Sequence, residues 1–136
     1  MLKSIRWTPR NNNEIADALS KQALRNGSFA ESVSDVNSAC YLFGVWDGAF
    51  DDGIAGSAFC IFASRAPPGG QVHECMQTIF KAGVRCNARS AQQSEILALM
   101  LLVQCLDAII LGRGCSFSCQ ERSASEALKR LCLELA

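Results

Sequence analysis

Apolar residues recur along this chain with the spacing of strands in some stretches and of helices in others. Stretches at 41–50, 55–64 and 73–85 carry apolar runs or alternation of strand length, and turn-forming residues separate them. Consecutive strands joined by short connections favour antiparallel pairing, so these stretches predict a three-stranded meander. Residues 2–8 alternate more loosely before Pro9 and suit a short edge strand.

Helical spacing of apolar residues predicts three helices. The first covers Glu14 to Leu24, follows asparagines able to cap it, and ends near Asn26-Gly27. The second opens with the capping-box pattern Ser90-Ala-Gln-Gln93, and the third is amphipathic from Ala124 to Leu135. The apolar face expected for the first helix consists of Ile15, Leu19 and Ala23.

A short strand at 115–119 and a polar connector at 27–39 complete the order of elements. The order is strand, helix, three strands, helix, strand and helix, which predicts a mixed sheet with helices packed on it. A chain of 136 residues is long enough to bury one substantial core. We therefore expect a single α/β domain.

Charge and cysteine usage limit the classes of partner and compartment. Thirteen basic and thirteen acidic residues cancel, so any nucleic acid must be held locally rather than by a global positive field. The eight cysteines mostly fall in apolar runs, which suggests buried thiols in a reducing compartment, cytoplasmic or nuclear. With no CxxC pair and one histidine, His73, a structural zinc site has few ligands available. The most apolar run, 96–111, is short for a membrane span, so no membrane is expected.

Asp47 is the first candidate for chemistry, because it is a single carboxylate in the apolar stretch Tyr41 to Phe50. We expect the strand to stop at this residue and to be followed by the turn residues Gly48 and Asp51-Asp52-Gly53. A carboxylate in such a position is costly unless it has a partner or a cation. The alternative is a plain hairpin in which Asp47 accepts turn hydrogen bonds.

Asp17 and Glu95 are the other candidates, each near the start of a predicted helix. Asp17 has a simpler explanation in its favourable interaction with the helix dipole. Glu95 opens a helix so apolar that we expect the carboxylate to point toward the interior, where it needs a partner. The alternative is a solvated glutamate that supports the dipole.

Three motifs together resemble the ribonuclease H family, especially its plant and retroelement branch. They match the family's first strand, first helix and last helix, each with an acidic residue at the matching place. The motifs are Val45-Trp-Asp-Gly-Ala-Phe50 with Gly53-Ile-Ala-Gly56, Ser90-Ala-Gln-Gln-Ser-Glu-Ile-Leu-Ala98, and Asn13-Glu-Ile-Ala-Asp-Ala-Leu-Ser20.

The resemblance implies a ribonuclease H-like mixed five-stranded sheet whose element order is circularly permuted. Residues 1–26 would supply the last strand and helix of the family order, 27–39 a connector, and 40–136 the first four strands and two helices. We therefore expect the two chain ends to lie close together. A chain formed from the tail of one domain and the head of the next is the alternative, so monomer and domain-swapped dimer both stay open.

The family's chemistry implies two Mg²⁺ or Mn²⁺ ions held by four carboxylates, which cut the RNA strand of an RNA/DNA hybrid. Asp47, Glu95 and Asp17 match three of the carboxylates, and Ser118 or the neighbouring Cys119 replaces the fourth. A serine offers no charge, so the second cation should bind weakly. Nucleic-acid contacts are expected from Arg10, Asn13, Lys21 and Arg89.

Three functions remain open on the sequence. The first is a metal-dependent endonuclease weakened by the missing carboxylate. The second is a catalytically degenerate domain that binds nucleic acid, and the third is a protein-interaction module that uses a sheet edge or a swapped half.

Overall fold

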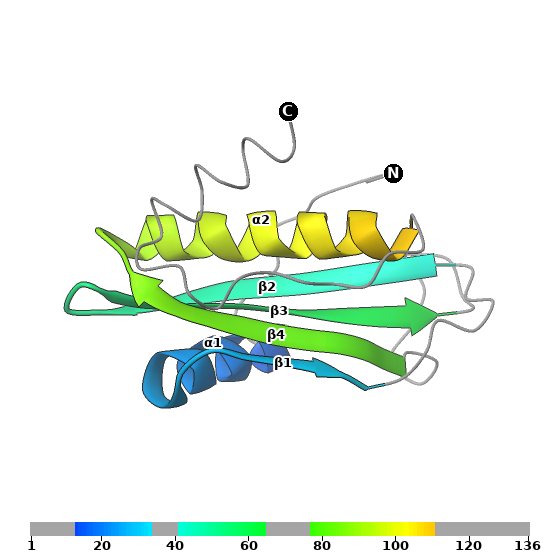
Figure 1. The fold of residues 1–136 in the computed structure, drawn as a ribbon, viewed down its shortest axis with the longest axis horizontal. Helices are drawn as coiled ribbons and strands as arrows, with labels where there is room; N and C mark the ends of the chain where they lie inside the picture. Colours follow the sequence, from blue (N-terminus) through cyan, green and yellow to red (C-terminus); the bar gives the residue numbers. More distant parts are fainter. Residues whose placement is uncertain (1–12, 34–40, 65–76, 111–136) are drawn as a thin grey trace.

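A computed structural model describes residues 13–33, 41–64 and 77–110 of the chain. Within these residues, one helix lies on each face of a four-stranded sheet (Figure 1). The elements in chain order are α1 (Glu14–Asn26), β1 (Phe29–Ser32), β2 (Tyr41–Asp51), β3 (Ile54–Ser64), β4 (Gln77–Asn87) and α2 (Ala91–Ile110).

The strands lie in the order β1-β4-β3-β2, and every pair of neighbours is antiparallel. The predicted meander is confirmed, and the architecture is α/β. The predicted strands at 2–8 and 115–119, the helix at 124–135 and both chain ends lie outside the described residues. The described sheet is therefore an open antiparallel one. It contains three of the five predicted strands, and the other two strands, the mixed sheet and the permuted order stay predictions.

β2 and β3 form a hairpin with a two-residue turn. Asp51 pairs with Ile54, and Asp52 and Gly53 between them have φ values of 45° and 82°. Two positive φ angles in succession are typical of a type I′ turn, which matches the twist of the flanking strands. The predictions that the strand stops at Asp47 and that Gly48 belongs to the turn are wrong, because the strand continues to Asp51.

The predicted connector at 27–39 contains a strand. Residues 29–32 form β1, which pairs with β4 from Phe29 opposite Gly83 to Ser32 opposite Phe80. The Oγ of Ser28 also accepts a hydrogen bond from the backbone N–H of Arg85 at 2.8 Å. The edge of β4 supplies these partners, so the strand depends on tertiary pairing rather than on a periodic pattern in its own sequence.

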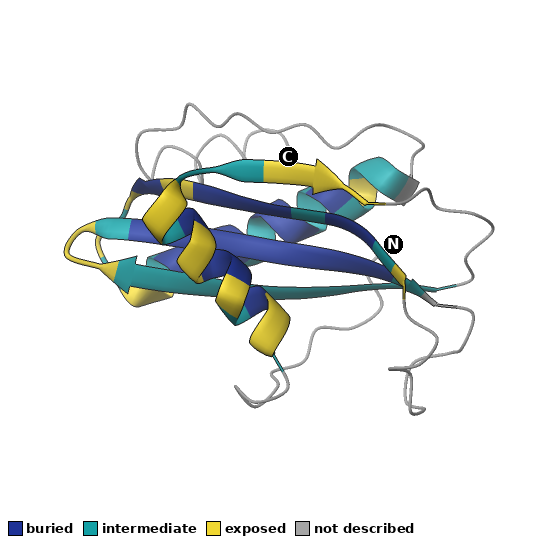
Figure 2. Ribbon diagram, turned by 90° about the horizontal axis from the view of Figure 1, so that it is seen from below, coloured by how far each residue is buried: buried dark blue, intermediate teal, exposed yellow. Residues whose placement is uncertain are grey.

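Two apolar clusters fill the two faces of the sheet. On the α2 face, Phe59 and Ile61 of β3 pack with Val84 of β4 and Leu97 and Leu101 of α2. On the α1 face, Leu19 packs with the β3 residues Ala58, Cys60 and Phe62. β3 is buried from both sides, as Figure 2 shows by its colour.

The face that α1 turns to the sheet includes Leu19 and Ala23, as its sequence predicts, but not Ile15. Ile15 is 52% exposed, whereas the buried residues are Ala16, Leu19, Ser20 and Ala23. A Cβ on Gly56 of β3 would overlap the backbone of Ser20 and Leu24, so the helix lies directly against that glycine. Three of these four buried residues, Ala16, Ser20 and Ala23, are small, and a larger side chain in their place would push the helix away from the strand.

α2 is long and apolar enough to cross a membrane by length and composition alone, over Ala91–Ile109. In the structure it packs along β2 and β3 instead (Figure 1). The core helix of a water-soluble domain can have the same length and composition, so these two properties do not distinguish a membrane span from a core helix. The apolar run 96–111 is helical as far as Ile110, where α2 ends.

Cysteines in the described residues are buried. Cys60 and Cys86 are not disulfide-bonded, and burial raises the pKa of Cys60 to about 11. Cys105 is disulfide-bonded. Because disulfides are rare in reducing compartments, this bond runs against the expectation of eight reduced thiols, and the cytoplasmic or nuclear location stays a prediction.

Candidate functional site

Asp47 lies inside β2, on the face of the sheet that α1 covers. Its neighbours at two-residue spacing, Phe43 and Val45, pack into the cluster around Leu19, which fixes the face to which odd-numbered residues point. The carboxylate accepts a hydrogen bond on Oδ1 from the backbone N–H of Gly48 at 2.9 Å. The Asp47 carboxylate, in the middle of a strand, is therefore held by the backbone N–H of the next residue and not by a turn.

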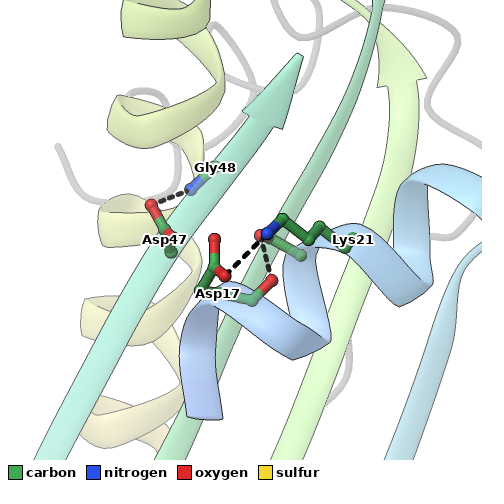
Figure 3. A network of polar contacts seen from close by, with 5 residues as sticks. Asp17, Lys21, Asp47 and Gly48 are labelled. Atoms are coloured by element: carbon green, nitrogen blue, oxygen red, sulfur yellow. Dashed lines mark hydrogen bonds and ion pairs between the residues drawn. The ribbon is translucent and has the colours of Figure 1, made fainter. Parts of the chain in front are cut away.

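Asp17 approaches Asp47 from α1 (Figure 3). Burial, the hydrogen bond with the carboxyl group of Asp17, and the charges of Asp17 and Glu95 raise the pKa of Asp47 above 3.8, while the Gly48 N–H donor opposes them. Two carboxyl groups in contact cannot both ionise freely unless a proton or a cation lies between them. Of the three acids expected to hold cations together, Asp17 and Asp47 therefore lie side by side, between α1 and β2.

The backbone of Glu95 lies close to β2, on the other face of the sheet. A Cβ on Gly48 would lie 2.6 Å from the backbone nitrogen of Glu95, so the start of α2 packs directly on the Asp47-Gly48 peptide. The buried Ser57 on β3 donates a hydrogen bond to the carbonyl of Ser94 at 2.7 Å and fixes this turn of the helix. The side chain of Glu95 is exposed, so the prediction that it points toward the interior is wrong.

The predicted capping box at the start of α2 is present, with one change. The backbone N–H of Gln93 donates to the Oγ of Ser90 at 3.1 Å, as the pattern predicts. The Oε1 of Gln93 accepts from the backbone N–H of Arg89 at 2.8 Å, one residue before the usual donor. This box sets where α2 begins and therefore where Glu95 lies relative to Asp47.

Lys21 and Asn13, two of the predicted nucleic-acid contacts, have partners within the protein. Lys21 Nζ lies 2.9 Å from Asp17 Oδ2 (Figure 3), and the Nδ2 of Asn13 donates to the carbonyl of Trp46 at 2.8 Å. Arg89 is exposed and stays a predicted contact. Arg10 and Ser118 lie outside the described residues.

Sequence reasoning missed the roles of Gly48 and of the Trp46 carbonyl. Gly48 provides the donor to Asp47 and the space in which α2 lies, and a glycine within an apolar strand was the signal for close backbone approach. The Trp46 carbonyl is a backbone group, so no side-chain pattern could have indicated it.

The residues fit a divalent cation in part. Magnesium is commonly held through one or two carboxylates, with water completing its coordination, and Asp17 and Asp47 supply such a pair. Among residues 13–33, 41–64 and 77–110, no three His, Cys, Asp or Glu side chains are arranged to hold a metal ion together. Asp17 and Asp47 would therefore hold the first cation, and Glu95 would have to turn inward from its exposed position to join them.

Comparison with family models, with curated proteins and with solved structures finds no match for this chain.

Proposed function

We propose that this chain is a metal-dependent endonuclease of the ribonuclease H type that cleaves the RNA strand of RNA/DNA hybrids. The observation that carries the proposal is the contact between Asp17 of α1 and Asp47 of β2, with the charge of Glu95 acting on the same carboxyl group. These acids come from three separate elements, and Asp17 and Glu95 stand 30 and 48 positions from Asp47 in the sequence. Each acid belongs to one of the three motifs that resemble the family. Local structure alone would not require Asp17 to contact Asp47, or the charge of Glu95 to act on the same carboxyl group.

The protein's own groups prepare the site. Gly48 N–H fixes the orientation of the Asp47 carboxylate, and the close packing of α2 on Gly48 sets the distance to Glu95. A divalent cation held by Asp17 and Asp47 would polarise a phosphoryl oxygen and lower the pKa of a bound water. Partial burial of Asp47 strengthens its attraction for that charge because water screens it less.

The missing fourth carboxylate should make the enzyme slow. If Ser118 occupies the place of that acid, the second cation lacks a charged ligand. We expect little cleavage with Mg²⁺, partial recovery with Mn²⁺, which accepts nitrogen and oxygen ligand sets more readily, and a large gain in Ser118→Asp.

The test is cleavage of a labelled RNA/DNA hybrid by the purified chain with Mg²⁺ or Mn²⁺. Asp47→Asn should lose cleavage, whereas Asp51→Asn, on the same strand but exposed, should keep it. Equal cleavage by the parent and Asp47→Asn would show that other residues perform the reaction. Cleavage of double-stranded DNA in preference to the hybrid would contradict the substrate class.

A catalytically degenerate module that binds nucleic acid or protein is the second candidate. The Lys21–Asp17 ion pair favours it, because a positive side chain already neutralises one of the acids without a metal. Hybrid binding that is independent of divalent cations, together with no cleavage by Ser118→Asp, would support this candidate.

A further inference from the structure

Asn13 occupies the N-cap position of α1 but does not cap the helix. Its backbone has φ −120° and ψ 30°, and its side chain makes no capping hydrogen bond. Asparagine is among the best N-cap residues, so its side-chain oxygen is expected to accept a hydrogen bond from a backbone N–H in the first turn of the helix. Here the side chain crosses to β2 instead, where Nδ2 donates to the carbonyl of Trp46 at 2.8 Å.

The hydrogen bonds of Asn13 end beside two of the candidate acids. Its carbonyl accepts from the backbone N–H of Asp17 at 3.0 Å. The Trp46 carbonyl, which accepts from its side chain, belongs to the peptide bond that leads into Asp47. One residue therefore connects the backbone of one acid to the peptide group of the other, and this connection joins α1 to β2 where Asp17 and Asp47 meet.

The edge of β2 at this point is occupied by side chains. Alternate residues of a strand turn their backbone groups to the same side, so the carbonyl of Trp46 and the N–H of Gly48 lie along one edge. Asn13 bonds to the first and the Asp47 carboxylate to the second. The orientation of the Asp47 side chain and the position of α1 are thus fixed through neighbouring peptide groups.

This arrangement is costly to the folded protein. The Oδ1 of Asn13 is buried and has no hydrogen-bond partner among the residues that the structure describes, although the other end of the same amide is bonded. A buried unpaired acceptor loses its interaction with water and gains nothing in return. Local rules of stability are broken most often at functional sites, and here the break lies beside the acid pair.

We propose that Asn13 is a positioning residue that holds α1 against β2 so that Asp17 faces Asp47. The inference rests on the proposed function, since the acid pair is the place where a cation would bind. It adds to the predicted contact between Asn13 and nucleic acid, because the Trp46 carbonyl accepts from only one of the two N–H donors of Nδ2.

Mn²⁺ affinity, measured by electron paramagnetic resonance on the full chain, tests the proposal. In Asn13→Ser the residue still caps a helix well but is too short to reach β2. We expect this variant to bind Mn²⁺ ~10–100-fold more weakly, as is common when a residue that orients a ligand is lost. Asn26→Ser, at the other, exposed end of α1, is the matched control and should leave affinity unchanged.

A double-mutant cycle with Asp17→Asn separates positioning from general stability. If Asn13 acts through Asp17, Asn13→Ser should weaken binding much less in the Asp17→Asn background than in the parent. Equal weakening in both backgrounds would overturn the proposal. Should Asn13→Ser fail to fold, Asn13→Asp keeps the shape and removes the donor. Weaker Mn²⁺ binding despite the added negative charge would support positioning, and unchanged or tighter binding would contradict it.

A parent chain that binds no Mn²⁺ would defeat the proposed function but not this inference. The nuclear magnetic resonance structure of metal-free Asn13→Ser then decides. Loss of the contact between Asp17 and Asp47 would support positioning, and a retained contact would overturn it.

Discussion

Lys21 Nζ lies 2.9 Å from Asp17 Oδ2, so the carboxylate that faces Asp47 already has a positive partner within the protein. The two side chains are four residues apart on α1, with the acid nearer the helix start, which is the favourable orientation for such a pair. Lys21 is 51% exposed and Asp17 28%. The ammonium group can therefore move into solvent when a cation takes its place.

Lys21→Gln should bind divalent cations more tightly, because no side chain then competes for Asp17. The affinity for the cation should rise by up to about fivefold, which is the equivalent of the ~1 kcal/mol that an exposed ion pair contributes at most. Isothermal titration with Mn²⁺ measures it. Lys81→Gln, which removes the pair of Lys81 with Glu31 at 3.3 Å between β4 and β1, is the control and should leave affinity unchanged. Weaker binding in Lys21→Gln would show that Lys21 assists the site.

Asp47→Asn should stabilise the metal-free protein near neutral pH. The pKa of Asp47 is raised in the folded state, so its protonated form is favoured there, and its contribution to stability is present below about pH 3.8 and is lost as pH rises through the raised pKa. Asparagine has no charge to bury and keeps an oxygen for the Gly48 donor. Urea denaturation with a chelator, repeated across the acid range, should show the difference between variant and parent shrinking as pH falls.

Asp51→Asn is the control for that experiment, because Asp51 ends the same strand and is exposed. Its effect on the free energy of unfolding should stay within about 0.5 kcal/mol. A parent more stable than Asp47→Asn near neutral pH would mean that the ionised Asp47 has a stabilising partner other than a cation.

Mg²⁺ or Mn²⁺ should raise the thermal midpoint of the parent chain. A ligand that binds only the folded state stabilises it by about 2.7 kcal/mol when its concentration is a hundred times the dissociation constant. Differential scanning fluorimetry with increasing cation measures the shift. The shift should vanish in Asp47→Asn and in Asp17→Asn, and its persistence in both would place the cation elsewhere.

Gly56→Ala should destabilise the fold more than Gly44→Ala. A Cβ on Gly56 would meet the backbone of Ser20 and Leu24, which can yield only if α1 moves, whereas a Cβ on Gly44 would meet the side chain of Leu102. Overpacking of this kind lowers the free energy of unfolding by about 1–3 kcal/mol. We expect the loss in Gly56→Ala to lie at or above the upper end of this range and the loss in Gly44→Ala near its lower end. The midpoints of urea denaturation compare them, and equal losses would show that α1 shifts without cost.

The sequence by itself determined the elements whose signals are local. The β2–β3 turn follows from Asp52-Gly53, the start of α2 from Ser90 and Gln93, and the end of α1 from Gly27, whose φ is 100°. In each case a few adjacent residues supply the required dihedral angles or hydrogen bonds. The same local motifs marked Asp17, Asp47 and Glu95 as candidates.

Only the tertiary structure decided how these residues are used. The burial of Ala16 rather than Ile15, the strand β1, the exposure of Glu95 and the bond from Asn13 to Trp46 all depend on partners distant in the sequence. Periodicity shows that a helix has an apolar face, but glycines such as Gly48 and Gly56 determine how closely each helix approaches the sheet. That approach brings Asp17 to Asp47, because contact between side chains of different elements is set by packing and not by spacing along the chain.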